Sequence, residues 1–328
     1  MRRCYISDEL ITDENKSNEH IIPNALGGHL KSDKLVTKRI NNGLFAELDA
    51  ILADQIELAR IIEFKRDRGE QPDIIGETSL GDKFKINSKK EVAEMMPFKP
   101  RVKLDENGSE LIVINAFYKN EYFKALQRKN PGITVEELKE KFNYREEYTV
   151  NKYTAYFKNG LGFIDEIEPF RCIAKIATNF AVDNDVEIKY IKNYIEFIKG
   201  DLGIEHVHLG YFYPCQRLQY NFGEKEISNI LYIKGCLKER VLYCYIELFN
   251  VHCFIVNLSY EYYGPDFDKS YIWDLKNGEI IDKPIRLDVN RDFLNNLSHP
   301  HSEGLKENYT LRLERLGKIE ELNFTKKD

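Results

Sequence analysis

The spacing of apolar residues changes along the chain, and each stretch predicts a different element. Apolar residues recur every three or four positions from Ile40 to Ala59, which predicts a helix over about residues 41–62 with one face in a core. The segment LKSDKLVT (residues 30–37) before it predicts one short strand. The first block of the chain is therefore expected to run strand, loop, strand, helix.

Helical spacing recurs further along the chain. It predicts helices over residues 135–148, after Thr134 as the N-cap, and over residues 167–184 and 189–201, while residues 110–118 (ELIVINAFY) have strand composition. Four later runs are rich in Ile, Val, Tyr and Phe: ISNILYIKG, RVLYCYIELFN, VHCFIVNLSYEYY and SYIWDLKNGE. These runs predict an antiparallel meander, and we expect the chain to belong to the α+β class.

A charged segment, FKRDRGEQPD (residues 64–73), follows the first predicted helix. It contains Gly and Pro turn signals, which favour a helix exit and a linker. We therefore expect a boundary after residue 66. A small module is predicted over residues 1–66, and a larger α+β domain with helices and an antiparallel sheet over residues 67–328.

The charge balance limits how this protein can meet nucleic acid. Its 48 Lys and Arg residues against 54 Asp and Glu give a net charge of −6, which excludes binding by bulk positive charge, so any contact must be local. The six cysteines lack paired spacing, and the first residues, MRRCYISDEL, carry no apolar signal segment, so we expect a cytoplasmic protein. No run of about 18 apolar residues occurs, so no membrane partner is expected.

The decapeptide EHIIPNALGG (residues 19–28) carries the most informative chemistry. Glu19 and His20 are adjacent, so on an extended segment they point to opposite faces and can perform different tasks. Pro23 prevents a helix, and Gly27 with Gly28 permits a tight turn between two strands. Taken alone, these residues favour a surface turn preceded by a structural histidine.

Further segments lie at fixed distances from this decapeptide: Cys4-Tyr5-Ile6-Ser7 before it, and Leu35 to Gly43 (LVTKRINNG) and Leu48-Asp49 after it. With them the sequence resembles the HNH endonuclease family, in the branch with the pattern CxxC, EHIIPxxLGG, CxxCN and a helix bearing an Asp. The resemblance covers about the first 60 residues. It is most specific in the decapeptide and in the asparagine at its expected distance.

The resemblance implies a ββα-metal fold in which a hairpin and one helix hold a divalent ion against the scissile phosphate. By position, His20 would be the general base that deprotonates water, a task that suits imidazole. Glu19 would bind the ion, and Asn41 would act in catalysis as the second protein ligand or its water-mediated partner. Asn42 is a close substitute as a ligand. The implied cofactor is Mg²⁺, or Mn²⁺ in its place.

Basic residues near this motif are candidates for contact with nucleic acid. Lys38 and Arg39 precede Asn41, and with Lys31 and Lys34 they form a modest basic cluster. The alternative is a solvated charged face. His29, directly after the glycines, is a candidate for phosphate contact, with a surface loop histidine as the alternative.

The resemblance departs from the family where the family binds structural zinc. Of the four zinc positions only Cys4 keeps a cysteine, while Ser7, Thr37 and Ile40 occupy the others. One thiolate cannot hold a structural zinc, so none is expected. We expect apolar packing in its place, among Ile6, Leu35, Val36, Ile40 and Leu44.

The resulting hypothesis is a metal-dependent HNH endonuclease, a hydrolase that cleaves nucleic-acid phosphodiester bonds, with DNA favoured over RNA. The larger domain would bind substrate, a protein partner or a trigger, or form a homo-oligomer, and the resemblance suggests an effector in bacterial antiviral defence. The rival hypothesis belongs to another class. In it the module is catalytically silent, and the protein is a nucleic-acid or partner-binding subunit of a defence complex.

Overall fold

The computed structural model describes most of the chain, and the chain divides into two compact units. The described residues are 2–56, 59, 62–69, 74–77, 83–86, 93–95, 101–104, 110–114, 119–145, 166–213, 223, 225–295 and 303–319. Unit 1 contains Met1–Gln71 together with Leu161–Asp328, and unit 2 contains Pro72–Gly160. Unit 2 is thus an insertion in the sequence of unit 1. The predicted division of labour between residues 1–66 and 67–328 stays a prediction.

The first elements of unit 1 follow the predicted order of strand, loop, strand and helix. They are β1 (Glu19–His20), the 3₁₀ turn η1 (Asn24–Leu26), β2 (Lys31–Ser32), α1 (Lys38–Ile40), the π-helical turn η2 (Asn41–Phe45) and α2 (Ala46–Gln55). The helical stretch begins at Lys38, three residues earlier than predicted, because Thr37 is extended and lies at the N-cap. Helix α2 ends at Gln55, since Ile56 has left the helical conformation with φ −91° and ψ 77°.

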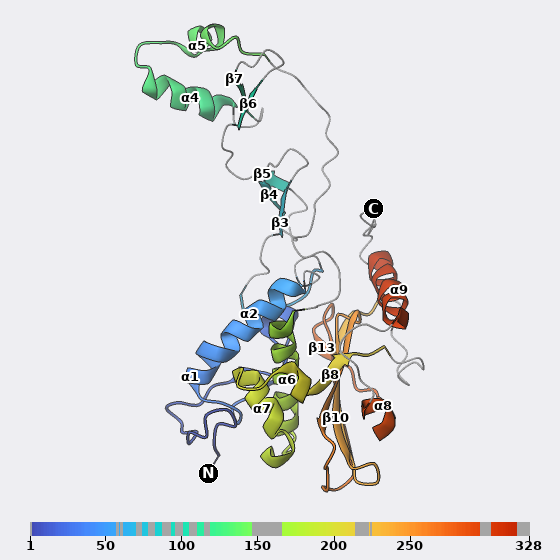
Figure 1. Cartoon of the computed structure of the whole chain (residues 1–328). Coiled ribbons are helices and arrows are strands. Elements are labelled where there is room, and N and C mark those ends of the chain that lie inside the picture. Colours follow the sequence, from blue (N-terminus) through green and yellow to red (C-terminus); the bar gives the residue numbers. More distant parts are fainter. Residues whose placement is uncertain are drawn as a thin grey trace. The chain divides into compact units, whose positions relative to one another are not determined.

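Two helices form the centre of unit 1, as the sequence predicts. Helix α6 (Ile167–Asp183) packs against α2 and against α7 (Lys192–Lys199), which follows the short turn η4 (Ile188–Tyr190). Helix α6 is buried along most of its length because α2 covers one side and the sheet covers another (Figure 1). A helix enclosed in this way must be apolar on nearly every face.

A six-stranded antiparallel sheet forms the other half of unit 1. Its order is β13-β12-β9-β10-β11-β8, with β8 at His208–Tyr211, β9 at Ser228–Cys236, β10 at Val241–Leu248, β11 at His252–Ser259, β12 at Phe267–Asp274 and β13 at Glu279–Ile280. The predicted meander is present in β9, β10 and β11. Strand β12, however, pairs with β9 and not with β11, whose other edge is occupied by β8.

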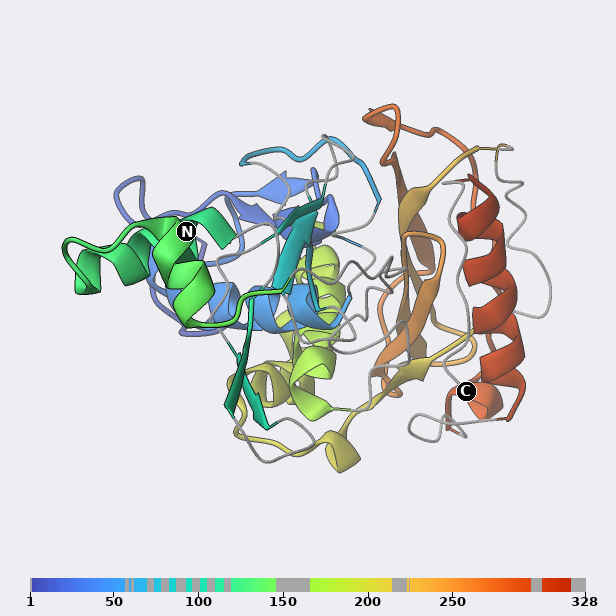
Figure 2. The same ribbon diagram turned by 90° about the horizontal axis from the view of Figure 1, so that it is seen from above.

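Helices cover both faces of this sheet. Helix α6 lies on one face and α9 (Glu303–Ile319) on the other, as Figures 1 and 2 both show; the short helix α8 (Arg291–Asn295) precedes α9, and η5 (Ile204–His206) precedes β8. Every residue of the central strand β10 is buried, because both of its faces meet helices. Helices and antiparallel strands in one chain confirm the α+β class.

The described residues of unit 2 form small sheets and two helices. Strands β3 (Ile74–Glu77), β4 (Lys83–Ile86) and β5 (Ala93–Met95) form a three-stranded antiparallel sheet, and β6 (Arg101–Leu104) pairs with β7 (Glu110–Val113). Helices α4 (Lys119–Lys129) and α5 (Val135–Lys141) follow. Thr134 caps α5 in a capping box with Glu137, which confirms the predicted N-cap. The strand predicted over residues 110–118 is β7 in its first four residues, and residues 115–118 lie outside the described part.

Among the described residues, no helix combines the length and the apolar composition that crossing a bilayer requires.

Candidate active site

The hairpin β1–β2 separates the side chains of Glu19 and His20. The strands are antiparallel, with Glu19 opposite Ser32 and His20 opposite Lys31. Successive residues of a strand point to opposite faces, and the two side chains accordingly meet different partners. Glu19 contacts Lys175 of α6, whereas His20 contacts Asp67, which follows α2 in the chain.

Both glycines of the decapeptide are required by the turn between the strands, for different reasons. Gly27 has φ +77°, a conformation that favours glycine. Gly28 is needed because a Cβ there would lie 1.8 Å from the carbonyl oxygen of Ile22. The turn is closed by the amides of Leu26 and Gly28, which both donate to the carbonyl of Pro23. The sequence thus fixes the loop that returns the chain to β2.

His20 and Asp67 form a hydrogen-bonded pair. Nε2 of His20 lies 3.1 Å from Oδ2 of Asp67, and Nζ of Lys31 lies 3.0 Å from the same oxygen. The His20 side chain is 6% exposed, and the side chains of Asp67 and Lys31 are 25% and 31% exposed. The cluster therefore lies at the surface, with the imidazole at its inner end.

Burial and the neighbouring charges determine whether the His20 imidazole is neutral or protonated. The hydrogen bond from Lys31 holds the pKa of the Asp67 carboxyl below its usual value, so Asp67 is ionised near neutral pH. Burial lowers the pKa of His20, and Asp67 opposes this only in part, so the imidazole is neutral there. The carboxylate accepts the proton of Nε2, which leaves the lone pair on Nδ1. No described residue donates a hydrogen bond to Nδ1.

His29 is held on the other side of Asp67. Its Nε2 donates to the carbonyl of Lys65 at 3.0 Å, its Nδ1 lies 4.0 Å from Asp67 Oδ1, and its ring stacks on Trp273 of β12 with centroids 4.1 Å apart. The side chain is 16% exposed. His29 thus joins the loop to the sheet, and the structure does not place it as a free surface histidine.

Glu19 belongs to a second, more deeply buried cluster. Nζ of Lys175 lies 2.6 Å from Oε1 of Glu19 and 2.6 Å from Oδ1 of Asp49. Lys175 is completely buried, and its ammonium also lies 4.8 Å from the centre of the Phe45 ring. Burial disfavours that charge, but the attraction of Asp49 and Glu19 outweighs it and raises the pKa of Lys175. Burial raises the pKa of Glu19, which Lys175 offsets in part.

The other predicted site residues lie apart from both clusters. The side-chain amide of Asn41 donates to Oγ of Ser17, and Asn42 is exposed. Lys38 donates to the carbonyl of Glu14 at 2.8 Å, and Arg39 forms an ion pair with Glu9 at 2.9 Å. Lys38 and Arg39 are therefore bound to the segment that precedes β1.

These positions test whether the implied Mg²⁺ fits the residues. Within the described residues, no group of three or more His, Cys, Asp or Glu side chains could hold a metal ion. Glu19 is 2% exposed, and its carboxylate is paired with the Lys175 ammonium. In this arrangement Glu19 does not fit the role of a metal ligand. Metal dependence of the protein itself stays a prediction.

Apolar packing occupies the region where the family binds zinc. Ile6, Leu35, Val36 and Ile40 are buried together in one core, and Leu44 packs against it partly buried. Cys4 is buried in the same core. The packing predicted for these five apolar residues is therefore present.

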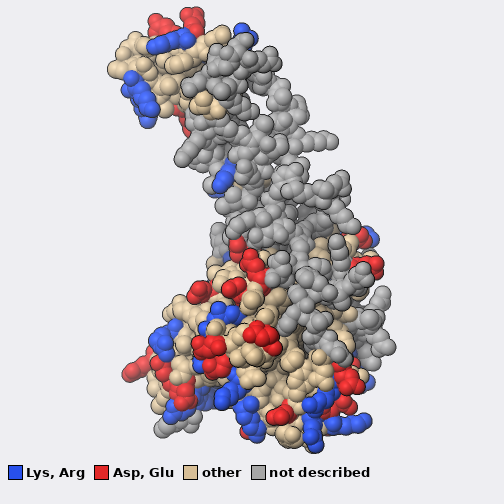
Figure 3. Space-filling view, in the orientation of Figure 1, with Lys and Arg blue, Asp and Glu red and all other residues tan. Residues whose placement is uncertain are grey.

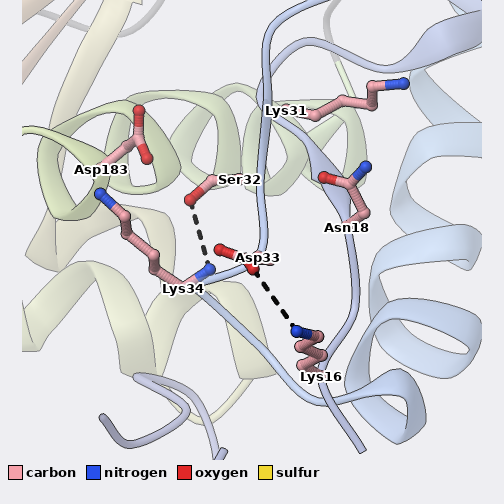
Figure 4. A pocket seen from close by; sticks show the side chains of 7 residues that line it. All are labelled: Lys16, Asn18, Lys31, Ser32, Asp33, Lys34 and Asp183. Carbon is pink, nitrogen blue, oxygen red and sulfur yellow. Dashed lines mark hydrogen bonds and ion pairs between the residues drawn. The ribbon is translucent and has the colours of Figure 1, made fainter. Parts of the chain in front are cut away.

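A pocket of about 580 Å³ opens beside the hairpin (Figure 4). Its walls are formed by Lys16, Asn18, Lys31, Ser32, Asp33, Lys34 and Asp183. Lys31 and Lys34 extend in opposite directions from the hairpin in Figure 4, and Lys16 lies 4.0 Å from Asp33. Lys31 lines this pocket and also contacts Asp67, whereas His20 and Asp67 are not among the residues that line it. Elsewhere in unit 1, Figure 3 shows acidic and basic side chains interspersed on the visible face.

Sequence reasoning missed two residues of these clusters. Asp67 lies in the charged segment that was interpreted as a linker, and nothing in that segment distinguishes it. Lys175 did carry a signal, because it is the only charged residue between Arg171 and Asp183 of a core helix. A lone buried ammonium requires an acidic partner.

No protein-family model, no curated protein and no solved structure matches the chain. Its chemistry is therefore argued from its own geometry.

Proposed function

We propose that this protein is an HNH-type endonuclease that hydrolyses phosphodiester bonds of nucleic acid, with His20 as its general base. The observation that carries this proposal is the His20–Asp67 pair. The imidazole of His20 is neutral and lies just below the surface. The ionised carboxylate of Asp67 is hydrogen-bonded to Nε2, and Nδ1 carries the lone pair.

The pair supports general base catalysis in a defined sequence. Nδ1 takes a proton from a water molecule as that water attacks phosphorus, and the imidazole becomes an imidazolium. The bond from phosphorus to the leaving sugar oxygen breaks, and that oxygen takes up a proton from solvent. Asp67 stabilises this positive charge through the Nε2 hydrogen bond and keeps the ring in one orientation, as carboxylates do in other His–Asp pairs. Lys31 balances the charge of Asp67 before the proton arrives.

The neighbouring pocket supports nucleic acid as the substrate. Three ammonium groups and two carboxylates line it. Because Lys31 also pairs with Asp67 and Lys16 with Asp13, Lys34 is the lining ammonium that has no ion pair among the described residues. Such a pocket suits a phosphate chain, whose negative charge must be met locally. DNA is the proposed substrate, as the resemblance implies.

The testing experiment is plasmid nicking by purified protein with Mg²⁺, Mn²⁺ or EDTA, in the wild type and the His20→Ala variant. Single-stranded DNA and RNA serve as further substrates. Loss of the base should lower the rate by about 10²–10⁴-fold. Lys189→Ala is the matched control, because Lys189 is exposed, pairs with Glu187 and lies outside both clusters. A folded His20→Ala variant that cleaves at the wild-type rate would contradict the proposal, and the metal arms test the implied cofactor.

One observation favours the rival function. The Lys175 ammonium forms an ion pair with Glu19, the residue that would bind the metal according to the resemblance. A module that has replaced its metal in this way could bind nucleic acid or a partner protein without cleaving it. Saturable DNA binding, with no cleavage of any substrate under any metal condition, would support this function.

A further inference from the structure

The buried cluster of Lys175, Glu19 and Asp49 has the composition of a cation site. Two carboxylates face one point from two elements, β1 and α2, and the ammonium of Lys175 lies 2.6 Å from an oxygen of each. The Cys172 thiol lies 3.5 Å from the same Asp49 oxygen, and the Phe45 ring completes the wall. With the acids ionised and the lysine protonated, the cluster has a formal charge of −1.

The ammonium and a divalent ion cannot share this position. Mg²⁺ binds oxygen at about 2.0–2.1 Å and Ca²⁺ at about 2.3–2.6 Å, distances close to those of Nζ here. An ion that ligated Glu19 Oε1 and Asp49 Oδ1 together would therefore overlap the ammonium nitrogen. The like charges would also repel at close range beside a fully buried lysine. One cation or the other can occupy the pair.

Lys175 is held firmly between the two carboxylates. It is fully buried in the middle of α6, and removing its charge from the acid pair would leave an ammonium without a partner in the core. Its side chain reaches the pair from a helix that is itself packed between α2 and the sheet. The protein therefore supplies the cation from its own framework.

We propose that Lys175 is a built-in cation that replaces a divalent metal between Glu19 and Asp49, and that Glu19 acts as a positioning residue. It anchors β1 to α6 on one face, so that His20 is presented on the other. The first part stands on the geometry of the cluster, and only the link to His20 rests on the proposed nuclease function.

The experiment compares thermal unfolding with and without Mn²⁺ in four forms of the full chain: wild type, Glu19→Gln, Lys175→Ala and the double variant. Wild type and Glu19→Gln should show the same small response to Mn²⁺. Lys175→Ala empties the cation position and leaves two carboxylates, of which Asp49 has a side chain that is 24% exposed. Its Tm should fall without metal and rise by about 5 °C or more with saturating Mn²⁺. The double variant should lose that rise.

A Mn²⁺ response in the wild type that disappears in Glu19→Gln would overturn the proposal, because Glu19 would then bind metal with Lys175 present. No Mn²⁺ response in a folded Lys175→Ala variant would also overturn it. If Lys175→Ala does not fold, Mn²⁺ titration of wild type and Glu19→Gln by electron paramagnetic resonance decides instead. Equal binding supports the proposal, and weaker binding by Glu19→Gln overturns it. None of these measurements depends on cleavage, so failure of the nuclease proposal remains distinguishable.

Discussion

Glu19 and His20 are neighbours in the chain, yet they belong to regions with opposite properties. On the inner face of β1, Glu19 meets a fully buried lysine in a closed cluster. On the outer face, His20 meets Asp67 and Lys31, whose side chains are a quarter to a third exposed. The closed side holds the hairpin in place, and the open side is available for chemistry. A two-residue strand thus gives its acid a structural contact and its base the environment that we propose for the reaction.

The two sides should therefore respond differently to substitution. Breaking a buried ion cluster leaves uncompensated charge in the core, whereas breaking a solvated one does not. Variants of the inner face should change stability, and variants of the outer face should change rate.

The largest expected effect comes from Lys175→Met, which leaves Glu19 and Asp49 without their cation. The free energy of unfolding should fall by about 3–5 kcal/mol, measured by urea denaturation. Lys189→Met is the matched control, since Lys189 and its partner Glu187 are both more than half exposed. Its stability should be nearly unchanged. If Lys175→Met and Lys189→Met lost the same free energy of unfolding, the buried cluster would have no special structural role.

On the open side, Asp67→Asn should slow nucleic-acid cleavage by about 10²-fold, within the range of general base catalysis, because the imidazolium loses its carboxylate. Its stability should change little, as Asp67 is partly solvated. Asp8→Asn, which removes an exposed pair with Arg3, is the control. A variant that unfolds more easily but cleaves normally would assign Asp67 to structure.

A smaller effect is expected on the pH dependence of cleavage. Burial lowers the pKa of His20 below 6.5, so kcat/KM should rise with pH through that lowered value and then level off as the base becomes neutral. Asp67 raises this pKa and Lys31 lowers it. The acidic limb should therefore move to lower pH in Asp67→Asn and to higher pH in Lys31→Met. If the acidic limb moved in the same direction in both variants, the group that titrates would not be His20.

The smallest effect concerns binding in the pocket. Lys34 makes no side-chain hydrogen bond or ion pair with any residue in the described ranges, so it is available to phosphate. Lys34→Ala should lower DNA affinity modestly and reduce the slope of log K against log salt by about 0.7–0.9. Arg39→Ala is the comparison, since Arg39 is already paired with Glu9. If Lys34→Ala and Arg39→Ala changed the slope equally, the pocket would not be the preferred site of phosphate binding.

Local patterns predicted much of the fold. The spacing of Phe170, Ile173 and Ala177 is sufficient to predict α6, because helix burial repeats every three to four residues. Strand composition likewise predicted β9, β10 and β11. The partner of β12 could not be predicted, because pairing depends on which sheet edge is left open after β8 has joined β11.

The site was predictable only where its residues are close in sequence. The decapeptide indicated a turn with an acid and a base on opposite faces, and the hairpin has that form. Asp67 lies 47 positions after His20, and Lys175 lies 126 positions after Asp49. Neither separation leaves a periodic signal, since such pairs form only when the whole unit has folded. The role of Glu19 depends on the second of these pairs.

The long sequence separation of Lys175 also affects how the protein is made. At a synthesis rate of about 5–20 residues per second, Asp49 is made roughly 6–25 s before the lysine that neutralises it. Throughout that interval Glu19 and Asp49 have no ammonium between them, and β1 lacks its contact with α6. The order of translation therefore delays completion of the hairpin until α6 has emerged from the ribosome, and His20 takes up its final position late in the synthesis of each molecule.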